Sequence, residues 1–437
     1  MYTVDRKNDT YIFTDSTESI KFNIPKDQFA DIVTPVSIPG ITNNKLFEEA
    51  ICKPAYGACL YNLAKEMNAK SASIIVSDVT RNVPTQKVAK YIINELIRAG
   101  MEADKVVFVI ALGVHRAATE NEIAEILGED LYASKIPFHL INHDAFDNKK
   151  LTYLGETTHG TKLEVNKEAY ECDLHISIGK VEPHEFAGFS GGRKSVMPGI
   201  SSAKSIIANH SPKMLASPNA IPGNLKNNPI HQDMLECANL YRIDFSVNFV
   251  VNDMSEPVAV FSGKLMESHL AAIDYLRKKI SISLNKPDII ITTPGYPLNV
   301  EFYQSLKPLI ALTDILNEDI IVAIYSQCPE GINSEDMMRA FKFSNNLDEI
   351  NDFAIKNYQI QMDHVLLLMK ILKKRVKIIA YSPNINADDF QSMHMIPCSS
   401  PDDIIPLATS LSNKEKPQIL IYPQAQKYLT TMRSICS

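Results

Sequence analysis

Apolar and polar positions along the first part of the chain follow two alternating patterns. Short runs rich in β-branched residues alternate with segments in which apolar residues recur at helical spacing. Because the short runs are apolar almost throughout, they are typical of parallel strands buried on both faces of a sheet. The pattern predicts a doubly wound α/β domain. Its expected strands lie at 71–78, 104–113, 137–144 and 174–181, and its helices at 84–100 and 119–127.

The same pattern restarts in the last third of the chain. Before it come a hairpin-like pair of runs at 246–253 and 257–264, a helical stretch, and the polar segment SLNKP. We therefore predict two α/β domains with largely parallel sheets. Their boundaries are 1–265 for the first domain, 266–286 for a connector, and 287–437 for the second domain. The expected strands of the second domain lie at 288–297, 320–326, 376–382 and 418–424.

Composition supports two cores and a small-molecule function. A chain of 437 residues exceeds the size at which single cores stop growing, about 250–300 residues. No apolar run approaches the ~20 residues of a membrane span, and the first residues lack the features of a signal peptide. Seven cysteines form no CxxC pair, as in a cytoplasmic protein with reduced thiols. A net charge of −7 without a strong basic cluster argues against nucleic-acid partners.

Glycine is scarce, with 16 residues in the chain, yet four of them gather directly after the expected strand 174–181. They are Gly188, Gly191, Gly192 and Gly199. Glycines at the carboxyl end of a strand let backbone N–H groups approach a phosphate, and a helix expected at 201–210 adds its N-terminus. The spacings GxxxxGK[ST], GxGxxG and HExxH are absent. A plain strand-to-helix turn is the alternative. The presence of His184, Arg193, Lys194 and His210 in the same segment favours a ligand site.

Polar residues also follow two further strands. Asp78 and Arg81 come after the first expected strand, and His115 comes after the second. Carboxyl ends of parallel strands share one edge of a sheet, so these residues and His184 are expected to form a site. Arg81 can bind a carboxylate or phosphate, and Asp78 can accept hydrogen bonds. The alternative is that Asp78 caps a helix beside a surface arginine. Eight other histidines are interpreted as surface or core residues.

Several motifs together carry a resemblance to a known family. They are SDVTR, GVHR, GKVEPHEFAGFSGGRKSVMPG, the His210 that follows Lys194 by sixteen residues, and GYPLNVEFYQSLK. Over nearly the whole chain, and in the same order, these motifs resemble the nickel-dependent lactate racemase family. The resemblance implies a racemase or epimerase of a 2-hydroxy acid that acts in the cleft between its two domains.

The resemblance also implies a cofactor and roles for individual residues. The cofactor is a nickel-pincer nucleotide, pyridinium-3,5-bisthiocarboxylic acid mononucleotide nickel, attached covalently to Lys194 and made and loaded by dedicated enzymes. His210 is the expected nickel ligand, and His115 and His184 the expected catalytic acid/bases during reversible transfer of the C2 hydride to the cofactor. The other expected cofactor contacts are Asp78, Arg81, Gly191 and Gly192. The expected substrate contacts are Arg81, Tyr303, Gln304 and Lys307.

The chemistry of the residues agrees with these roles but leaves alternatives open. Inverting an sp³ carbon requires a flat intermediate and a base on each of its faces. Imidazole has a pKa of roughly 6.5, so a histidine can serve as the acid in one direction and as the base in the other. Gln304 and Lys307 are three residues apart and share one face of an expected helix, although a surface pair has the same spacing. Two alternatives are a zinc hydrolase or lyase that uses His115, His184 and His210, and a nucleotide-binding module without catalysis. The substrate could be a lactate-like, malate-like, aromatic or sugar acid.

Overall fold

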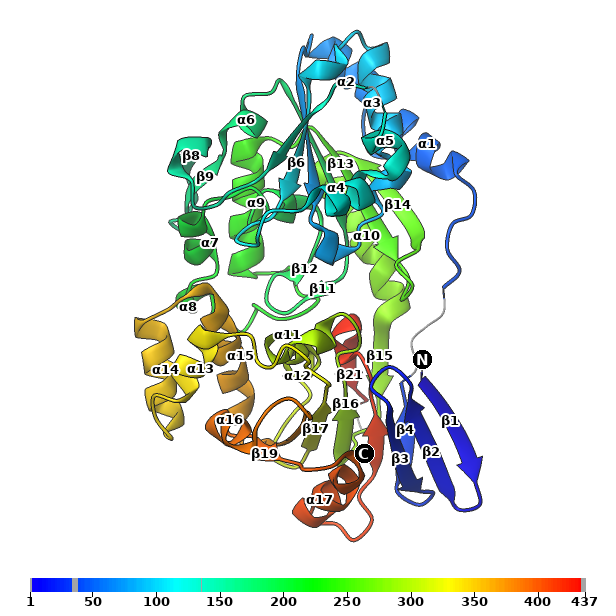
Figure 1. The fold of residues 1–437 in the computed structure, drawn as a ribbon, viewed down its shortest axis with the longest axis vertical. Coiled ribbons are helices and arrows are strands. Elements are labelled where there is room, and N and C mark those ends of the chain that lie inside the picture. Colours follow the sequence, from blue (N-terminus) through cyan, green and yellow to red (C-terminus); the bar gives the residue numbers. More distant parts are fainter. Residues whose placement is uncertain (1, 34–37, 135, 434–437) are drawn as a thin grey trace. The chain divides into compact units, whose positions relative to one another are not determined.

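The computed structural model describes residues 2–33, 38–134 and 136–433. The chain divides into two compact units. Unit 1 consists of residues 1–36 together with 280–437, and unit 2 of residues 37–279 (Figure 1). Each contains a six-stranded, largely parallel sheet, which confirms the predicted α/β class. Among the described residues, no helix is long and apolar enough to cross a membrane.

Unit 2 is built on a sheet with the strand order β14-β13-β10-β5-β6-β7. The central strands run parallel, and β14 pairs antiparallel with β13 as the expected hairpin. The strands are β5 (Ala72–Ser77), β6 (Val106–Ala111), β7 (His139–Asn142), β10 (Leu174–Lys180), β13 (Phe245–Val251) and β14 (Pro257–Gly263). Outside this sheet lie two short pairs, β8 (Leu151–Glu156) with β9 (Lys162–Asn166), and β11 (Pro183–His184) with β12 (Gly188–Phe189).

Helices cover both faces of this sheet, α3 on one side and α9 on the other (Figure 1). Alternate residues of β5 explain this: Ile74 packs in the same apolar cluster as Ile92 of α3, whereas Ser73 hydrogen-bonds Tyr241 of α9 at 3.1 Å. The helices of unit 2 are α1 (Lys45–Cys52), α2 (Leu60–Glu66), α3 (Ala89–Arg98), α4 (Glu120–Leu127), α5 (Glu129–Tyr132), α6 (Lys167–Tyr170), α7 (Ala203–Asn209), α8 (Pro212–Leu215), α9 (Pro229–Tyr241) and α10 (Leu265–Ile280).

Unit 1 contains a parallel sheet with the strand order β19-β18-β17-β16-β20-β4. Its strands are β4 (Phe29–Ile32), β16 (Ile289–Thr292), β17 (Ile321–Tyr325), β18 (Lys377–Tyr381), β19 (Ile396–Pro397) and β20 (Ile419–Ile421). Its helices are α11 (Phe302–Ser305), α12 (Lys307–Ala311), α13 (Glu335–Phe341), α14 (Leu347–Lys356), α15 (Asp363–Leu372), α16 (Ala387–Ser392) and α17 (Ile404–Leu411).

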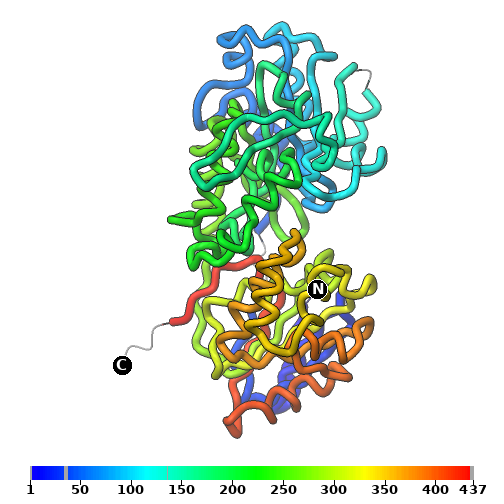
Figure 2. The backbone as a smooth tube through the Cα atoms, turned by 90° about the vertical axis from the view of Figure 1, so that its left-hand side faces the viewer, coloured from blue at the N-terminus to red at the C-terminus, as the bar shows by residue number. Residues whose placement is uncertain are grey.

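The first residues of the chain belong to unit 1, whereas the sequence pattern had assigned them to the first domain. β1 (Tyr2–Lys7), β2 (Thr10–Asp15) and β3 (Ile20–Pro25) form an antiparallel sheet, the N-terminal sheet. Alternate residues of β3 are buried, and Phe22 joins the same apolar cluster as Ile289 of β16. Figure 2 shows this blue segment beside the orange and red end of the chain. One-sided apolar strands need a partner surface, which the β16–β17 face provides.

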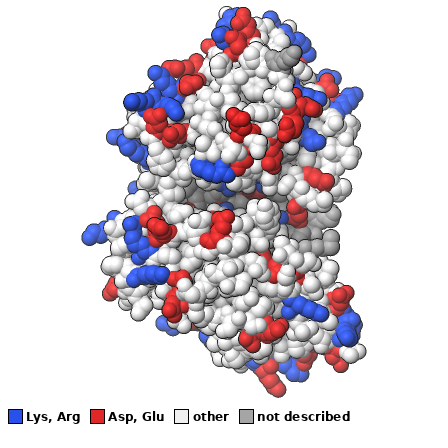
Figure 3. Space-filling view, in the orientation of Figure 1, with Lys and Arg blue, Asp and Glu red and all other residues white. Residues whose placement is uncertain are grey.

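The expected connector 266–286 is also divided between the units. α10 fills most of it and belongs to unit 2, while β15 (Ser281–Leu284) pairs with β21 (Leu429–Met432) in unit 1. The chain therefore passes from one unit to the other at the end of a helix, where the polar composition of the segment had predicted a linker. On the face that Figure 3 shows, described acidic and basic side chains are interspersed without a large area of one sign.

Candidate active site

Three neighbouring strands of unit 2 carry the predicted polar residues at their carboxyl ends. β5 lies between β10 and β6 in the sheet, and all three run parallel. Asp78 follows β5, His115 lies shortly after β6, and His184 lies shortly after β10. Gly113, beside His115, donates its N–H to the carbonyl of Gly199 at 2.9 Å, which joins the β6 loop to the glycine-rich segment. The sheet therefore brings this part of the predicted site together.

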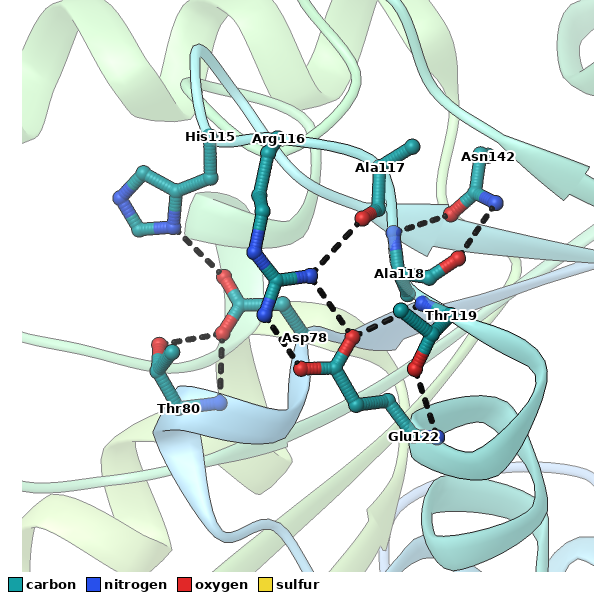
Figure 4. A network of polar contacts seen from close by, with 9 residues as sticks. All are labelled: Asp78, Thr80, His115, Arg116, Ala117, Ala118, Thr119, Glu122 and Asn142. Carbon is teal, nitrogen blue, oxygen red and sulfur yellow. Dashed lines mark hydrogen bonds and ion pairs between the residues drawn. The ribbon is translucent and has the colours of Figure 1, made fainter.

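Asp78 and His115 form a hydrogen-bonded pair (Figure 4). Asp78 caps the 3-10 turn η1 (Val79–Arg81) through Thr80, and its Oδ2 lies 3.0 Å from Nδ1 of His115. Burial raises the pKa of Asp78, but the hydrogen bond to His115 and the charge of Arg81 outweigh burial and bring that pKa to about 2. The ionised carboxylate keeps a proton on Nδ1 of His115, so Nε2 is the nitrogen that can exchange a proton with a substrate.

The next residue, Arg116, has a different partner. Its Nη2 lies 2.6 Å from Oε1 of Glu122, and its Nη1 donates to Oε2 of the same carboxylate at 2.8 Å. Glu122 also completes a capping box with Thr119 at the start of α4 (Figure 4). This pair ties the loop of His115 to a helix, so Arg116 serves the structure of the loop.

His184 contacts Lys194 across the glycine-rich segment. His184 ends β11, which pairs with β12, and Lys194 lies in the 3-10 turn η5 (Gly192–Ser195). Nζ of Lys194 lies 3.2 Å from Nε2 of His184, and Oε2 of Glu185 lies 3.2 Å from Nδ1. The backbone N–H of Ala187 also points at Nδ1, at 3.4 Å, so this nitrogen faces both a donor and a carboxylate. A base and an amine thus lie within one hydrogen bond of each other.

His210 is linked to His184 by an aromatic ring that contacts both of them. The ring of Phe186 packs edge-on against His184, with centroids 4.7 Å apart, and against His210, with centroids 4.9 Å apart. His210 caps the C-terminus of α7 and is 6% exposed. Its Nδ1 lies 3.0 Å from the carbonyl oxygen of Ile206, which fixes the proton on Nδ1 and the lone pair on Nε2. Metal-bound imidazoles have this arrangement.

Two glycines give the segment a backbone that other residues rarely adopt. Gly191 and Gly192 have φ values of +77° and +52°, and Gly192 donates its N–H to Oδ1 of Asn248 at 3.0 Å. A Cβ on Gly192 would lie 2.8 Å from the ring of His269. His269 is 1% exposed, and its Nε2 lies 2.8 Å from the carbonyl of Ser190. The loop therefore rests directly on β13 and α10.

Arg193 lies inside the unit beneath this loop. Its guanidinium is 0% exposed and donates to the carbonyls of Ala187 at 2.8 Å and Gly191 at 3.3 Å. Among the described residues, no carboxylate lies within ion-pair distance of it, and burial lowers its pKa to about 9. Burial, followed by the charge of Arg193, lowers the pKa of His269 well below its ordinary value. Arg193 thus ties together the two ends of segment 187–191, which lies between His184 and Lys194 in the chain.

The remaining predicted residues lie in unit 1. Tyr303 and Gln304 belong to α11, and Lys307 begins α12, so Leu306 interrupts the single helix expected here. Gln304 and Lys307 are partly exposed. The hydroxyl of Tyr303 donates to Oδ1 of Asp363 at 2.9 Å. Tyr303 therefore has a structural partner that the sequence did not indicate.

The structure adds residues that sequence reasoning missed. Phe186, Asn248 and His269 support the glycine-rich segment, and His269 had been interpreted only as a surface or core residue. The clustering of glycines was a signal that something must lie close beneath the loop, but it did not identify the partners. In the described part of the chain, no group of three or more His, Cys, Asp or Glu side chains is arranged to hold a metal ion. The three-histidine zinc site therefore has no support here.

Comparisons with known proteins cover both units. Residues 16–223 match the lactate racemase N-terminal domain, and residues 282–426 match the lactate racemase C-terminal domain. A lactate racemase from Thermoanaerobacterium thermosaccharolyticum is 31% identical over 409 residues, which are 91% of this chain and 93% of the relative. A lactate racemase from Lactiplantibacillus plantarum is 32% identical over 313 residues, which are 71% of this chain and 71% of the relative.

Solved structures agree with the sequence matches. The lactate racemase apoprotein from Thermoanaerobacterium thermosaccharolyticum matches with a TM-score of 0.87 at 28% identity, covering 97% of this chain and 100% of that chain. A protein from Thermotoga maritima matches with a TM-score of 0.68 at 17% identity, covering 91% of this chain and 100% of that chain, and shares the fold. The matched racemases are isomerases. The chain therefore belongs to the lactate racemase family of isomerases.

Proposed function

We propose that the protein racemises or epimerises a 2-hydroxy acid, with lactate as the first candidate. The observation that carries the proposal is the pair of imidazoles after β6 and β10, the two strands that flank β5 in unit 2, with His115 held by Asp78 and His184 in contact with Lys194. Two acid/bases are what the inversion of one carbon requires. Membership of the lactate racemase family supports the choice of lactate.

The residues of unit 2 also fit a nickel-pincer nucleotide. Lys194 offers an amine for a covalent bond, and His210 offers an Nε2 lone pair whose orientation is fixed by the bond from Nδ1 to Ile206. The backbone at Gly191 and Gly192 has the open conformation that close approach to a phosphate requires. When bound, such a group supplies an acceptor for the hydride of substrate C2.

The side chains of the protein have separate tasks in this proposal. His115 and His184 exchange the hydroxyl proton on opposite faces of the substrate, and Asp78 keeps Nε2 of His115 ready for that exchange. His184 has a second task, because it can accept the proton that the ammonium group of Lys194 must lose before its amine can act as a nucleophile. Asp78 and Arg81 also line the cofactor.

The carboxylate of the substrate needs cations. Arg81 of unit 2, which is exposed, and Lys307 of unit 1 are assigned to this carboxylate, and Gln304 of unit 1 is a further substrate contact. Tyr303, whose hydroxyl donates to Asp363, anchors α11, the helix that carries Gln304. Dedicated enzymes that synthesise and load the cofactor are the expected partners.

Intact mass and chiral analysis test the proposal together. The full chain is co-expressed with cofactor-synthesis enzymes, and wild type is compared with Lys194→Arg, His210→Ala and the control Lys204→Arg. We expect one adduct with nickel in wild type and the control, none in Lys194→Arg, and an adduct without nickel in His210→Ala. The loaded wild type should convert pure L-lactate toward a racemic mixture.

Two outcomes would contradict the proposed function. If loaded wild type leaves pure enantiomers of lactate, malate, phenyllactate and gluconate unchanged, the proposal is wrong. Stoichiometric zinc without a Lys194 adduct would favour the hydrolase or lyase alternative instead.

A further inference from the structure

A buried carboxyl group of unit 2, Asp233, accepts hydrogen bonds from three side chains. Asp233 lies on α9 and is 0% exposed. Its Oδ1 accepts from the hydroxyl of Thr157, and its Oδ2 accepts from the hydroxyl of Thr161 at 2.8 Å. Nδ2 of Asn209 donates to the same Oδ2 at 2.6 Å and to the carbonyl of Ile230 at 3.3 Å. The threonines lie in the turn between β8 and β9, and Asn209 ends α7, so one carboxyl group joins three elements.

The bond to Asn209 lies next to the expected nickel ligand. His210 directly follows Asn209 in the chain. Its backbone N–H donates to the carbonyl oxygen of Ile206 at 2.9 Å, and its Nδ1 lies 3.0 Å from the same oxygen. These two contacts fix the imidazole ring of His210 to the last turn of α7. The position of α7 therefore decides where Nε2 of His210 lies.

α7 depends on its neighbours for that position. It has seven residues, and isolated helices shorter than about 12 residues are marginally stable in water. Its first turn is tied to β9, because Oγ of Ser205 donates to the carbonyl of Lys162 at 2.7 Å and accepts from the N–H of Glu164 at 3.0 Å. Its last residue is tied to α9 by the bond from Asn209 to Asp233. α7 is thus held at both ends.

Two substitutions separate the contacts of Asp233. A carboxylate only accepts hydrogen bonds, and the lone pairs on its two oxygens suffice for three donors. An alanine at 233 removes the acceptor of all three. An alanine at 209 removes only the donor beside His210 and leaves Thr157 and Thr161 their acceptor. Asn209→Ala therefore tests the bond to α7 without disturbing the bonds to the β8–β9 turn.

A second carboxylate on α9 provides a matched control. Glu236 accepts from the N–H and from the hydroxyl of Thr158, each at 2.6 Å. It lies three residues after Asp233, on the next turn of α9. Glu236 thus also binds the β8–β9 turn, and its hydrogen bonds among the described residues go to Thr158 alone.

We propose that Asp233 is a positioning residue for nickel. Through Asn209 it holds the last turn of α7, and with it Nε2 of His210, in the place where the metal is bound. Groups that orient a metal ligand without touching the metal typically change metal affinity 10–100-fold. The link from His210 to nickel rests on the proposed function, whereas the link from Asp233 to α7 does not depend on it.

Hydrogen exchange of the full-length protein without cofactor tests the link from Asp233 to α7. Peptides covering 203–210 report on this helix. We expect them to lose protection on the order of tenfold in both Asp233→Ala and Asn209→Ala, because each variant lacks a hydrogen bond to a charged acceptor. β10 should keep the protection of wild type, and Glu236→Ala should follow wild type throughout.

Asn209→Ala keeps this test decisive even if Asp233→Ala does not fold. Protection of α7 within twofold of wild type in Asn209→Ala would overturn the proposal. A loss in Glu236→Ala equal to that in Asn209→Ala would also overturn it, since contact between α9 and the β8–β9 turn would then suffice.

Nickel release from the loaded protein tests the link to His210. Wild type and variants are incubated with a chelator, and intact mass follows nickel and the Lys194 adduct separately. We expect nickel to leave Asp233→Ala and Asn209→Ala on the order of tenfold faster than wild type and Glu236→Ala, with the adduct retained. The double variant should release nickel no faster than the faster single variant, because both changes remove the same bond.

The release rates also define how the proposal fails. Wild-type rates in both single variants would overturn it. Effects that multiply in the double variant would overturn it as well, because the side chains of Asp233 and Asn209 would then act independently. If the wild type takes up no nickel, the proposed function fails, and the exchange results alone decide whether Asp233 holds α7.

Discussion

Asp78 in unit 2 and Glu18 in unit 1 are both buried carboxyl groups near the carboxyl ends of parallel strands, yet their pKa values move in opposite directions. Asp78 has the imidazole of His115 and the charge of Arg81 beside it, so its pKa falls to about 2 despite burial. Burial and the charge of Asp15 raise the pKa of Glu18 to about 7. The difference teaches that partners, rather than burial, decide whether a carboxyl group acts as a permanent charge.

The two units also differ in where along the chain the supporting residues come from. In unit 2, the groups that hold the site come from loops after adjacent strands and from one glycine-rich segment. In unit 1, the loop before α11 depends on Glu18, which accepts from Nδ2 of Asn299 at 2.7 Å and lies 281 residues before it in the chain. Unit 2 therefore has a largely self-supporting site, whereas unit 1 depends on a distant segment.

The largest expected effect comes from Asp78→Asn. The amide cannot hold the imidazole of His115 in its present tautomer, so general acid–base catalysis by His115 should be lost. We expect kcat of the loaded enzyme to fall on the order of 1,000-fold, or about 4 kcal/mol, without loss of the Lys194 adduct. Chiral assay and intact mass check this. A fall of less than tenfold would mean that His115 does not need a fixed carboxylate partner.

Glu18→Gln should change the pH dependence of stability. Because the folded pKa of about 7 exceeds the ordinary value of 4.5, the folded state keeps a proton that the unfolded state has lost. The resulting stability is full below pH 4.5 and disappears as the pH rises through 7, a change of about 3 kcal/mol. Urea unfolding at pH 5 and 8 should show a smaller decrease in the variant. Equal decreases in both proteins would contradict the raised pKa.

Two glycine substitutions compare the space around a loop of unit 2 with the space around a loop of unit 1. Gly188 and Gly331 have similar φ values, +77° and +70°, but a Cβ on Gly188 meets the carbonyl of Asn224 at 2.3 Å and one on Gly331 meets nothing within 4 Å. We expect Gly331→Ala to cost about 1 kcal/mol from backbone strain alone. Gly188→Ala should cost about 3 kcal/mol. Urea midpoints measure both, and equal costs would show that unit 2 relaxes freely.

The smallest effect is expected for Glu122→Gln. The hydrogen bond to Arg116 lowers the pKa of Glu122 to about 2, but the side chain of Arg116 is 70% exposed and solvent screens the pair. Glutamine can also complete the capping box with Thr119. Stability should change by less than about 0.5 kcal/mol and kcat by less than twofold. This variant is the matched control for Asp78→Asn, since both alter the same loop network.

The sequence predicted the parts of the fold that depend on local pattern. The apolar run at 174–181 became β10, and the runs at 71–78 and 104–113 contain β5 and β6. Alternation of apolar and polar residues at the N-terminus is a strand signal that the sequence analysis passed over. What one sequence could not show is the partner surface of these strands, which lies more than 250 residues away.

The residues of the candidate site also fall into those that the sequence could predict and those that it could not. Asp78, His115 and His184 could be placed together because they follow adjacent parallel strands, and the glycine cluster marked the loop before Lys194. Arg193 and Asn248 could not be assigned their roles, since burial beneath a loop depends on tertiary packing. The interruption at Leu306 likewise depends on how α11 and α12 pack, and spacing alone predicted one continuous helix.

The assignment of residues 1–36 to unit 1 has a consequence for biosynthesis. These residues leave the ribosome before those of unit 2, but β4 pairs with β20, which is made about 390 residues later. At 5–20 residues per second, the delay is roughly 20 to 80 seconds. Unit 2 is inserted between the two parts of unit 1 and can fold during this time. The nascent N-terminal strands, with Phe13 and Phe22, must meanwhile stay unaggregated until their partner strands emerge.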